Sequence, residues 1–360
     1  MQNRFNFVGT VSFPKDDSKR PFYHEFTKNN RKMRSLNFGI KSDGHNMGFV
    51  EMFGAEQDVI KARSDDGENL EIEWADRFDE ESINSVSSIY LTTVNLGEGF
   101  ERQSFLSSFD AIGYLKDNLR DAADRTIIAT GRITKQFYNG RVFDRYQLQN
   151  IYVPTDTSKV KPKLNVTFEL VYNKDSVDKT EWKEEKKIYI DGYTPTYIDK
   201  DNGTKYVAQR VCFNASKVDP NNQNHVDRMN YRLKFINIPN KKAVKMCFEG
   251  YLINGSEAIE FDESQLTDLQ REAVALGIKT LEDYRPRGQI LGERVQEIRL
   301  VNPYLRQEYS DGIIDLGETM SQFEEEQVYV PPTEESLEDV FKTAEKSIVK
   351  EVEIDDDDLF

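Results

Sequence analysis

Two runs of alternating side chains that meet at Asn139–Gly140, within residues 125–153, constrain the fold more than any other part of this sequence. Asn-Gly favours a two-residue type I′ turn, because both residues of that turn need a positive φ. Such a turn fixes the strand register, so Lys135 must face Asp144 across the ladder. The sequence therefore predicts a β-hairpin in which each cross-strand pair is known.

This register divides the side chains of the hairpin between two faces. The predicted core face carries Ile133, Phe137, Val142, Tyr146 and Leu148. The opposite face is left to solvent, and it carries Arg132, Thr134, Gln136, Tyr138, Arg141, Phe143, Arg145 and Gln147. Rings stack on unpaired bases and arginines hold phosphates, so this face is typical of a surface that binds single-stranded nucleic acid. The alternative is that its two rings pack beneath another part of the chain.

The segment 14–35 has a similar composition. It holds seven Lys and Arg against three Asp and Glu, a net charge of +4, with aromatic residues between the cations. We expect it to form a loop, and its candidate DNA-binding residues are Phe22, Tyr23, Lys28, Arg31, Lys32 and Arg34. In the simpler alternative the loop is solvated and its rings pack onto the domain.

The order of predicted elements in the first half is that of an OB-fold barrel. Strands are expected at 4–13, 33–41 and 47–53, followed by a helix at 108–124 and then the Asn-Gly hairpin. A helix in that place suits the OB fold, here with an insertion at about residues 55–100, whereas an immunoglobulin-like sandwich needs no such helix.

The second half is a variation on the same plan. Predicted elements are strands at 164–172, 186–193, 205–214 and 230–238, a hairpin over 243–261 that turns at Asn254–Gly255, a helix over 267–277 and a last strand at 293–303. Weaker nucleic-acid candidates here are Arg210, Lys217, Arg228, Tyr231, Arg232 and Lys234. The predicted fold is therefore mainly β, with tandem OB-fold-like barrels.

Charge separates a tail from this body. Residues 306–360 carry 18 acidic and four basic residues, a net −14 of the total −16, and the rest of the chain is close to neutral. An acidic pI therefore does not exclude nucleic acid as a partner of the body. We expect an OB-fold-like DNA-binding domain at 1–153, a linker at 154–163, a second β-barrel domain at 164–305 and a flexible acidic tail at 306–360.

The C-terminal tip has the character of a peptide ligand: four carboxylates, two apolar side chains and the terminal carboxylate. Its residues are Asp355, Asp356, Asp357, Asp358, Leu359 and Phe360. This tip resembles the C-terminus of bacterial single-stranded DNA-binding proteins and of several phage counterparts. The resemblance implies that the acids steer the tip to basic surfaces, that Leu359 and Phe360 fill an apolar pocket on replication, recombination or repair proteins, and that the tip competes with DNA for the protein's own groove.

Signals for catalysis, metal binding or export are scarce. His24, His45 and His225 have no second ligand at metal spacing, and no glycine-rich phosphate loop is present. Cys212 and Cys247 favour a reducing compartment, and no apolar run is long enough to span a membrane. We expect a non-enzymatic protein without a cofactor or membrane contact, in the cytoplasm of a bacterial cell or a phage-infected host.

The sequence thus favours a single-stranded DNA-binding protein that coats exposed strands with little sequence preference. It would act in replication, recombination and repair as a monomer able to bind cooperatively, and it would recruit partners through its tip. The alternative is a phage structural or assembly protein that uses β-barrel domains for protein contacts.

Overall fold

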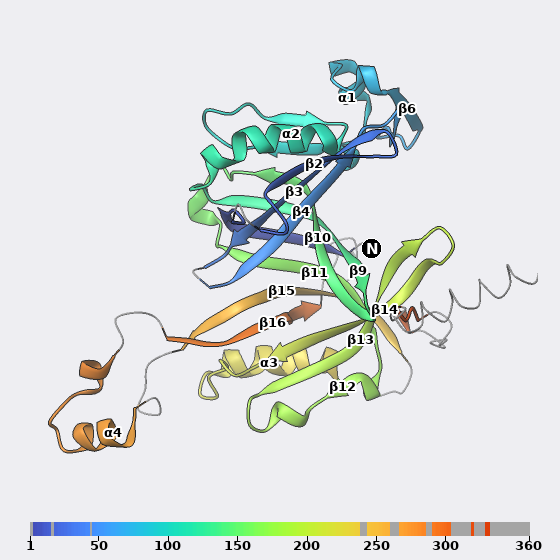
Figure 1. The fold of residues 1–360 in the computed structure, drawn as a ribbon. Coiled ribbons are helices and arrows are strands. Elements are labelled where there is room, and N and C mark those ends of the chain that lie inside the picture. Colours follow the sequence, from blue (N-terminus) through green and yellow to red (C-terminus); the bar gives the residue numbers. More distant parts are fainter. Residues whose placement is uncertain are drawn as a thin grey trace, which may run out of the picture.

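The computed structural model describes residues 3–15, 18–43, 45–237, 243–259, 266–285, 290–303, 318–319 and 328–331. The acidic tip from Asp355 to Phe360 and most of the predicted tail lie outside these described residues. The fold is mainly β, as predicted (Figure 1).

Strands of the first half are β1 (Arg4–Ser12), β2 (Tyr23–Lys28), β3 (Arg31–Lys41), β4 (Met47–Ala55), β5 (Val59–Arg63), β6 (Asn69–Glu73), β7 (Thr92–Asn95), β8 (Gln103–Phe105), β9 (Ile127–Tyr138) and β10 (Arg141–Tyr152). The second half has β11 (Lys163–Tyr172), β12 (Val177–Asp178), β13 (Lys187–Asp199), β14 (Gly203–Asn214), β15 (Val244–Ile259), β16 (Ile290–Pro303) and β17 (Glu318–Thr319). The α-helices of the described residues are α1 (Glu80–Ser85), α2 (Ser108–Asn118), α3 (Gln223–Ile236) and α4 (Asp268–Ala275).

Strands β1, β3, β4, β10 and β9 close on themselves, and we call this circuit the first barrel. β1 pairs with β3 at one end and with β9 at the other, and β4 pairs in parallel with β10 at Val50↔Tyr146. Helix α2 precedes β9, and the Ser107 hydroxyl caps it by accepting a hydrogen bond from the Phe109 amide at 3.1 Å. This is the strand order and helix position predicted for an OB-fold barrel.

Strands β11, β13, β14, β16 and β15 repeat that circuit and form the second barrel. β11 pairs with β13 and β15, and β14 pairs in parallel with β16 at Cys212↔Arg299. Helix α3 takes the place that α2 has in the first barrel, between the third and fourth strands. Gly131 faces Leu148 in one barrel as Gly250 faces Leu300 in the other, beside a bulge in each case.

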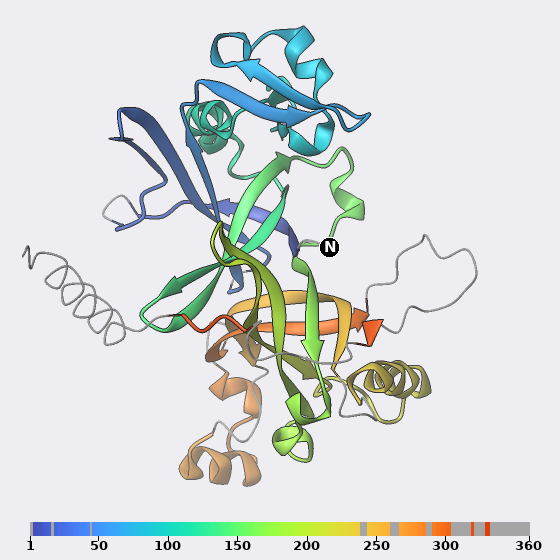
Figure 2. The ribbon, with the colours of Figure 1, turned by 90° about the vertical axis from the view of Figure 1, so that its right-hand side faces the viewer.

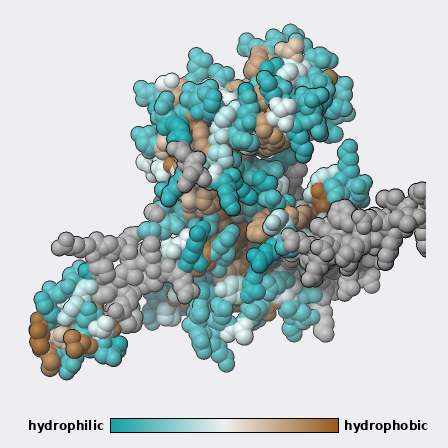
Figure 3. Space-filling view, viewed as in Figure 1, coloured by the Kyte–Doolittle hydropathy of each residue, from teal (hydrophilic) through white to brown (hydrophobic). Residues whose placement is uncertain are grey.

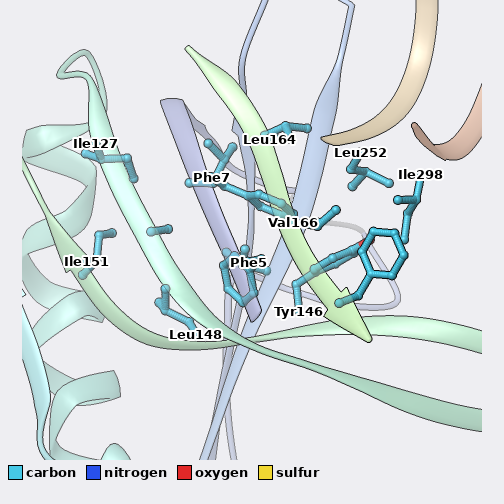
Figure 4. Packing of buried hydrophobic residues seen from close by; sticks show 14 of the residues in the cluster. Phe5, Phe7, Ile127, Tyr146, Leu148, Ile151, Leu164, Val166, Leu252 and Ile298 are labelled. Carbon is cyan, nitrogen blue, oxygen red and sulfur yellow. The ribbon is translucent and has the colours of Figure 1, made fainter. Parts of the chain in front are cut away.

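The two barrels share one sheet and one core. Their first strands pair antiparallel, and Phe5 stands opposite Val166 in that ladder. Because equivalent strands pair with each other, the barrels are related by an approximate twofold axis. Buried side chains run through from Phe7 and Ile127 on one side to Leu252 and Ile298 on the other (Figure 4).

The insertion of the first barrel forms a small unit of its own. Strands β5 and β6 pair only with each other within the described residues. A separate cluster of buried side chains fills this unit: Ile60, Ala62, Ile72, Val86, Leu91 and Leu106. Figure 2 shows the insertion on the first barrel, at the end of the molecule opposite the second barrel.

Two predictions for the second half were wrong. Residues predicted as a strand at 230–238 lie largely in helix α3, whose apolar residues Met229, Leu233 and Ile236 recur at helical spacing. The hairpin predicted over 243–261 does not turn at Asn254–Gly255, because β15 runs straight through that dipeptide. A Cβ on Gly255 would lie 1.7 Å from the carbonyl oxygen of His45, so this glycine permits a close approach to the first barrel and not a turn.

Segments at the far end of the chain return to the second barrel, while α4 projects from it. The Tyr329 amide donates to the Tyr206 carbonyl of β14 at 2.9 Å, and the Tyr329 ring lies 4.8 Å from that of Phe137. Leu269, Leu276 and Ile278 of the α4 unit are exposed. Figure 3 shows brown, hydrophobic surface at the projecting end of the molecule where α4 lies in Figure 1.

Candidate nucleic-acid interface

The hairpin β9–β10 has the predicted register. Its turn residues Asn139 and Gly140 have φ of 46° and 69°, as a type I′ turn requires. Tyr138 pairs with Arg141, and the remaining pairs down to Arg132↔Gln147 follow. The predicted pair Lys135–Asp144 forms an ion pair of 2.6 Å.

The side chains of the hairpin also divide as predicted. Tyr138 and Phe143 are 67% and 45% exposed, so neither ring is buried beneath the second barrel. Arg132 and Arg141 are exposed on the same face, and Gln136 is half-buried there. The opposite face meets the second barrel instead, where the Lys135 ammonium donates to the Gln209 side chain of β14.

Arg145 differs from the other arginines of this face. Its guanidinium pairs with Glu51 of β4, which neutralises its charge. Its Nε is buried and has no hydrogen-bond partner among the described residues. Arg145 therefore links β10 to β4 through this ion pair. Its positive charge is less available to an external phosphate than the charges of Arg132 and Arg141.

Strand β4 contributes two exposed rings that the sequence analysis did not single out. Phe49 and Phe53 are 53% and 56% exposed on the outside of the barrel. The inward positions include Gly48 and Gly54, where a Cβ would lie 2.5 Å from the Phe7 ring and 2.3 Å from the Phe109 amide nitrogen. A signal was present, since the alternation of MGFVEMFGA places both phenylalanines on one face and both glycines on the other.

The inward face of β4 also carries Val50 and Met52, which are buried, while its two rings stay outside on the same face as Glu51. Fully burying a phenylalanine side chain stabilises a fold by about 1.5–3 kcal/mol relative to leaving it exposed. Phe49 and Phe53 each lose part of that stabilisation, because about half of each side chain stays exposed. Exposed apolar groups that gather on one face commonly mark a binding surface.

Rings from β2 extend the same face. Phe26 lies 6.4 Å from Phe53 between ring centroids, and His24 stacks on Phe26 at 5.2 Å. Alternation and pairing place these rings on one side of the sheet β2-β3-β4-β10-β9. We call it the outer aromatic face, and its members are His24, Phe26, Phe49, Phe53, Tyr138 and Phe143, with the cations Lys28, Arg132 and Arg141.

The basic segment 14–35 is a strand hairpin over much of its length, although a loop was predicted. Strands β2 and β3 meet at Asn29–Asn30, whose φ values of 52° and 60° again suit a type I′ turn. Lys28, Arg31 and Lys32 are exposed near this turn. Arg31 pairs with Asp58 of the insertion, so its charge is already balanced.

Three residues of this segment have structural roles. Phe22 is 8% exposed and packs edge-on against Phe13 at 4.8 Å, so its ring cannot stack on a base. Arg34 lies 3.8 Å over the Phe109 ring and pairs with Glu25 at 2.8 Å. Hydrogen bonds from Arg34 and the Tyr23 hydroxyl lower the pKa of the Glu25 carboxyl, which makes this contact a network within the barrel.

The described residues hold no group of three or more His, Cys, Asp or Glu side chains able to bind a metal ion. Among the helices described, none has the length and apolar character needed to cross a bilayer.

Comparison with protein-family models and with curated proteins finds no match to this chain. Among solved structures, a deletion mutant of the single-stranded DNA binding protein from Thermus aquaticus is similar over 71% of this chain and 87% of that chain. Its sequence identity is 8% and its TM-score is 0.27, values too low to carry an argument about function.

Proposed function

We propose that this chain is a non-enzymatic single-stranded DNA-binding protein that coats DNA through the outer aromatic face of its first barrel. The face of the second and third OB strands, with the loops beside it, is where proteins of this fold bind oligonucleotides. Here that face lies on β3 and β4, and the β9–β10 turn borders it.

The observation that carries the proposal is β4, with phenylalanine outside and glycine inside. A ring such as Phe53 offers a flat apolar surface on which any base can stack, which suits binding without sequence preference. Arg132 and Arg141 lie on the same face for phosphates, and within the described residues neither has a carboxylate partner.

The roles of single residues remain proposals. We place Arg132, Gln136, Tyr138, Arg141 and Phe143 in the interface, together with Lys28 and Lys32 at the β2–β3 turn. Phe49 and Phe53 join this set. We assign structural roles, in packing or in ion pairs within the protein, to the other five candidates: Phe22, Tyr23, Arg31, Arg34 and Arg145.

Fluorescence anisotropy with labelled oligo-dT tests the proposal. Stacking is worth about 1–3 kcal/mol per base, so Phe53→Ala should weaken binding roughly 5- to 150-fold. Phe49→Ala, and Phe143→Ala combined with Tyr138→Ala, should act in the same direction. Phe78→Ala is the matched control, because Phe78 is 59% exposed on the insertion and outside the face.

Salt separates DNA binding from the alternative role in assembly. Affinity for oligo-dT should fall steeply with added salt, because phosphate contacts release counterions. Absence of binding at low salt would remove the proposal and leave the barrels as scaffolds for protein contacts. Equal affinity of the Phe53→Ala and wild-type proteins would remove the stacking role.

We also propose that the acidic tip recruits replication, recombination or repair proteins, on the resemblance of its residues alone. Deleting residues 351–360 should leave affinity for oligo-dT equal or higher and should abolish binding of such partners. A lower DNA affinity after the deletion would contradict competition between tip and DNA. The division at 1–153, 164–305 and 306–360 also stays a prediction, which limited proteolysis can test.

A further inference from the structure

Three cations of the second barrel gather where α3 meets the barrel strands. Arg228 and Arg232 lie four residues apart on α3 and so share one side of that helix. The Arg232 Nε donates to the Asn302 side chain of β16 at 3.0 Å, which fixes that guanidinium. Lys163, the first residue of β11, holds its Nζ 4.7 Å from the centre of the Tyr251 ring.

These cations lie close enough to repel one another; Arg232 is partly buried, whereas Lys163 and Arg228 are exposed. Burial lowers the pKa of the Arg232 guanidinium, and the charge of Arg228 lowers it further. Burial also lowers the pKa of the Lys163 ammonium; the nearby Glu249 carboxylate opposes this shift, and the charge of Arg232 adds to it to a smaller extent. Such repulsion costs free energy that a bound anion would recover.

No carboxylate among the described residues forms an ion pair with Lys163, Arg228 or Arg232. Among the partly buried or buried arginines described, four pair with a carboxylate (Arg34, Arg77, Arg145 and Arg299), whereas Arg125 donates to the Leu96 carbonyl oxygen and Arg232 to the Asn302 side chain.

We propose that Lys163, Arg228 and Arg232 bind the phosphodiester backbone of a nucleic acid strand, as a second anion site apart from the outer aromatic face. Tyr231 adjoins them on α3 and is 37% exposed, with its ring held edge-on against Phe235 at 5.1 Å. A phosphate site with a fixed ring beside it suits a strand better than a lone phosphate.

The inference rests on the proposed function and extends it to the second barrel. The outer aromatic face belongs to β2, β3, β4, β10 and β9, whereas this cluster belongs to α3, β11, β15 and β16. In Figure 2, α3 lies beside the second barrel, at the end of the molecule away from the insertion. A strand that reaches both sites must therefore be longer than one that fills the first barrel alone.

Salt titrations with two oligomers test the second site. One oligo-dT of about 30 nucleotides can occupy two barrels at ~4–16 nucleotides each, and one of about 6 can occupy only one. The variant is Lys163→Ala/Arg228→Ala, which leaves the Arg232–Asn302 hydrogen bond in place. With the long oligomer, the slope of log K against log salt should become shallower by about 1.4, a loss of roughly 25-fold in affinity at 0.1 M salt.

Arg271→Ala/Arg285→Ala is the matched control, since it removes the same charge from exposed arginines that pair with Asp268 and Glu282. The control should keep the wild-type slope, and the short oligomer should bind all three proteins alike. An unchanged slope for the Lys163→Ala/Arg228→Ala protein with the long oligomer would overturn the inference. An equal loss with the short oligomer would place the cluster in the first site and overturn it as well.

Calorimetric titration with inorganic pyrophosphate distinguishes a strand from a free phosphate compound. If the variant loses pyrophosphate binding while its DNA slope stays at the wild-type value, the cluster binds free phosphate compounds and the strand assignment fails. Failure of the wild-type protein to bind oligo-dT at all would instead refute the proposed function, and the pyrophosphate titration would still test the anion site.

Discussion

Replacing Lys135 with methionine should destabilise the protein by about 3 kcal/mol. The Lys135 side chain is 4% exposed, its Nζ lies 2.6 Å from the Asp144 carboxylate, and it also donates to Gln209 of the second barrel. Removing one partner of a buried ion pair costs about 3–5 kcal/mol, because the other charge is left uncompensated. Asp144 is 22% exposed and keeps some contact with water, so the low end of that range applies.

The double variant Lys135→Met/Asp144→Leu should recover most of this loss. Replacing both members of a buried pair with apolar groups is often close to neutral, because the cost of desolvating two charges disappears with their attraction. Urea denaturation followed by circular dichroism measures the free energy of unfolding of the wild-type, single and double variants. The matched control is Lys61→Met, which breaks an exposed cross-strand pair with Glu71 and should cost less than about 1 kcal/mol.

The reasoning fails if Lys135→Met costs no more than Lys61→Met. It also fails if the double variant is as unstable as the single one, since the loss would then come from the altered packing on β14 and not from an uncompensated charge.

Three further predictions concern single sites. Gly131→Ala should cost more than about 2 kcal/mol, because its Cβ would lie 1.9 Å from the Gln147 carbonyl oxygen; an unchanged melting temperature would contradict this. Asn139→Ala should lower stability by about 1 kcal/mol through the positive φ of the turn, whereas Asn139→Gly should be nearly neutral in the same denaturation assay. Burial raises the pKa of the Cys212 thiol to about 12, so it should react with a disulfide reagent at about pH 8 only after unfolding, and rapid reaction of the native protein would refute its burial.

The sequence predicts a turn at each of the Asn-Gly dipeptides Asn139–Gly140 and Asn254–Gly255. The structure has a turn at only the first of these two. Asn139–Gly140 forms the predicted two-residue turn, since both flanking runs can pair with each other directly. Asn254–Gly255 lies within β15, where the Asn254 amide donates to the Asn46 side chain of the first barrel at 2.8 Å. Local propensity favours a turn at both places, but in the second a contact between barrels holds the chain extended.

The phenylalanines of β4 illustrate a second limit. Alternation separates Phe49 and Phe53 from their neighbours, but it does not say which side faces the core. Hydrophobicity alone does not decide, because Val50 and Met52 lie on the glycine side and Glu51 lies on the phenylalanine side. The structure chooses the glycine side, because the Phe7 ring and the start of α2 already fill the space beside Gly48 and Gly54.

By itself, the sequence determined the β9–β10 register, the Lys135–Asp144 pair, the mainly β character and the helix α2, because each depends on residues close together in the chain. Only the tertiary structure decided that β1 pairs with β11, that Phe22 is buried and that Arg145 pairs with Glu51, which lies 94 residues away. Those outcomes depend on which distant surfaces close the two barrels. A tight turn determines the pairing of the residues beside it. The burial of a side chain and the ion pair that it forms depend instead on contacts with residues far away in the sequence.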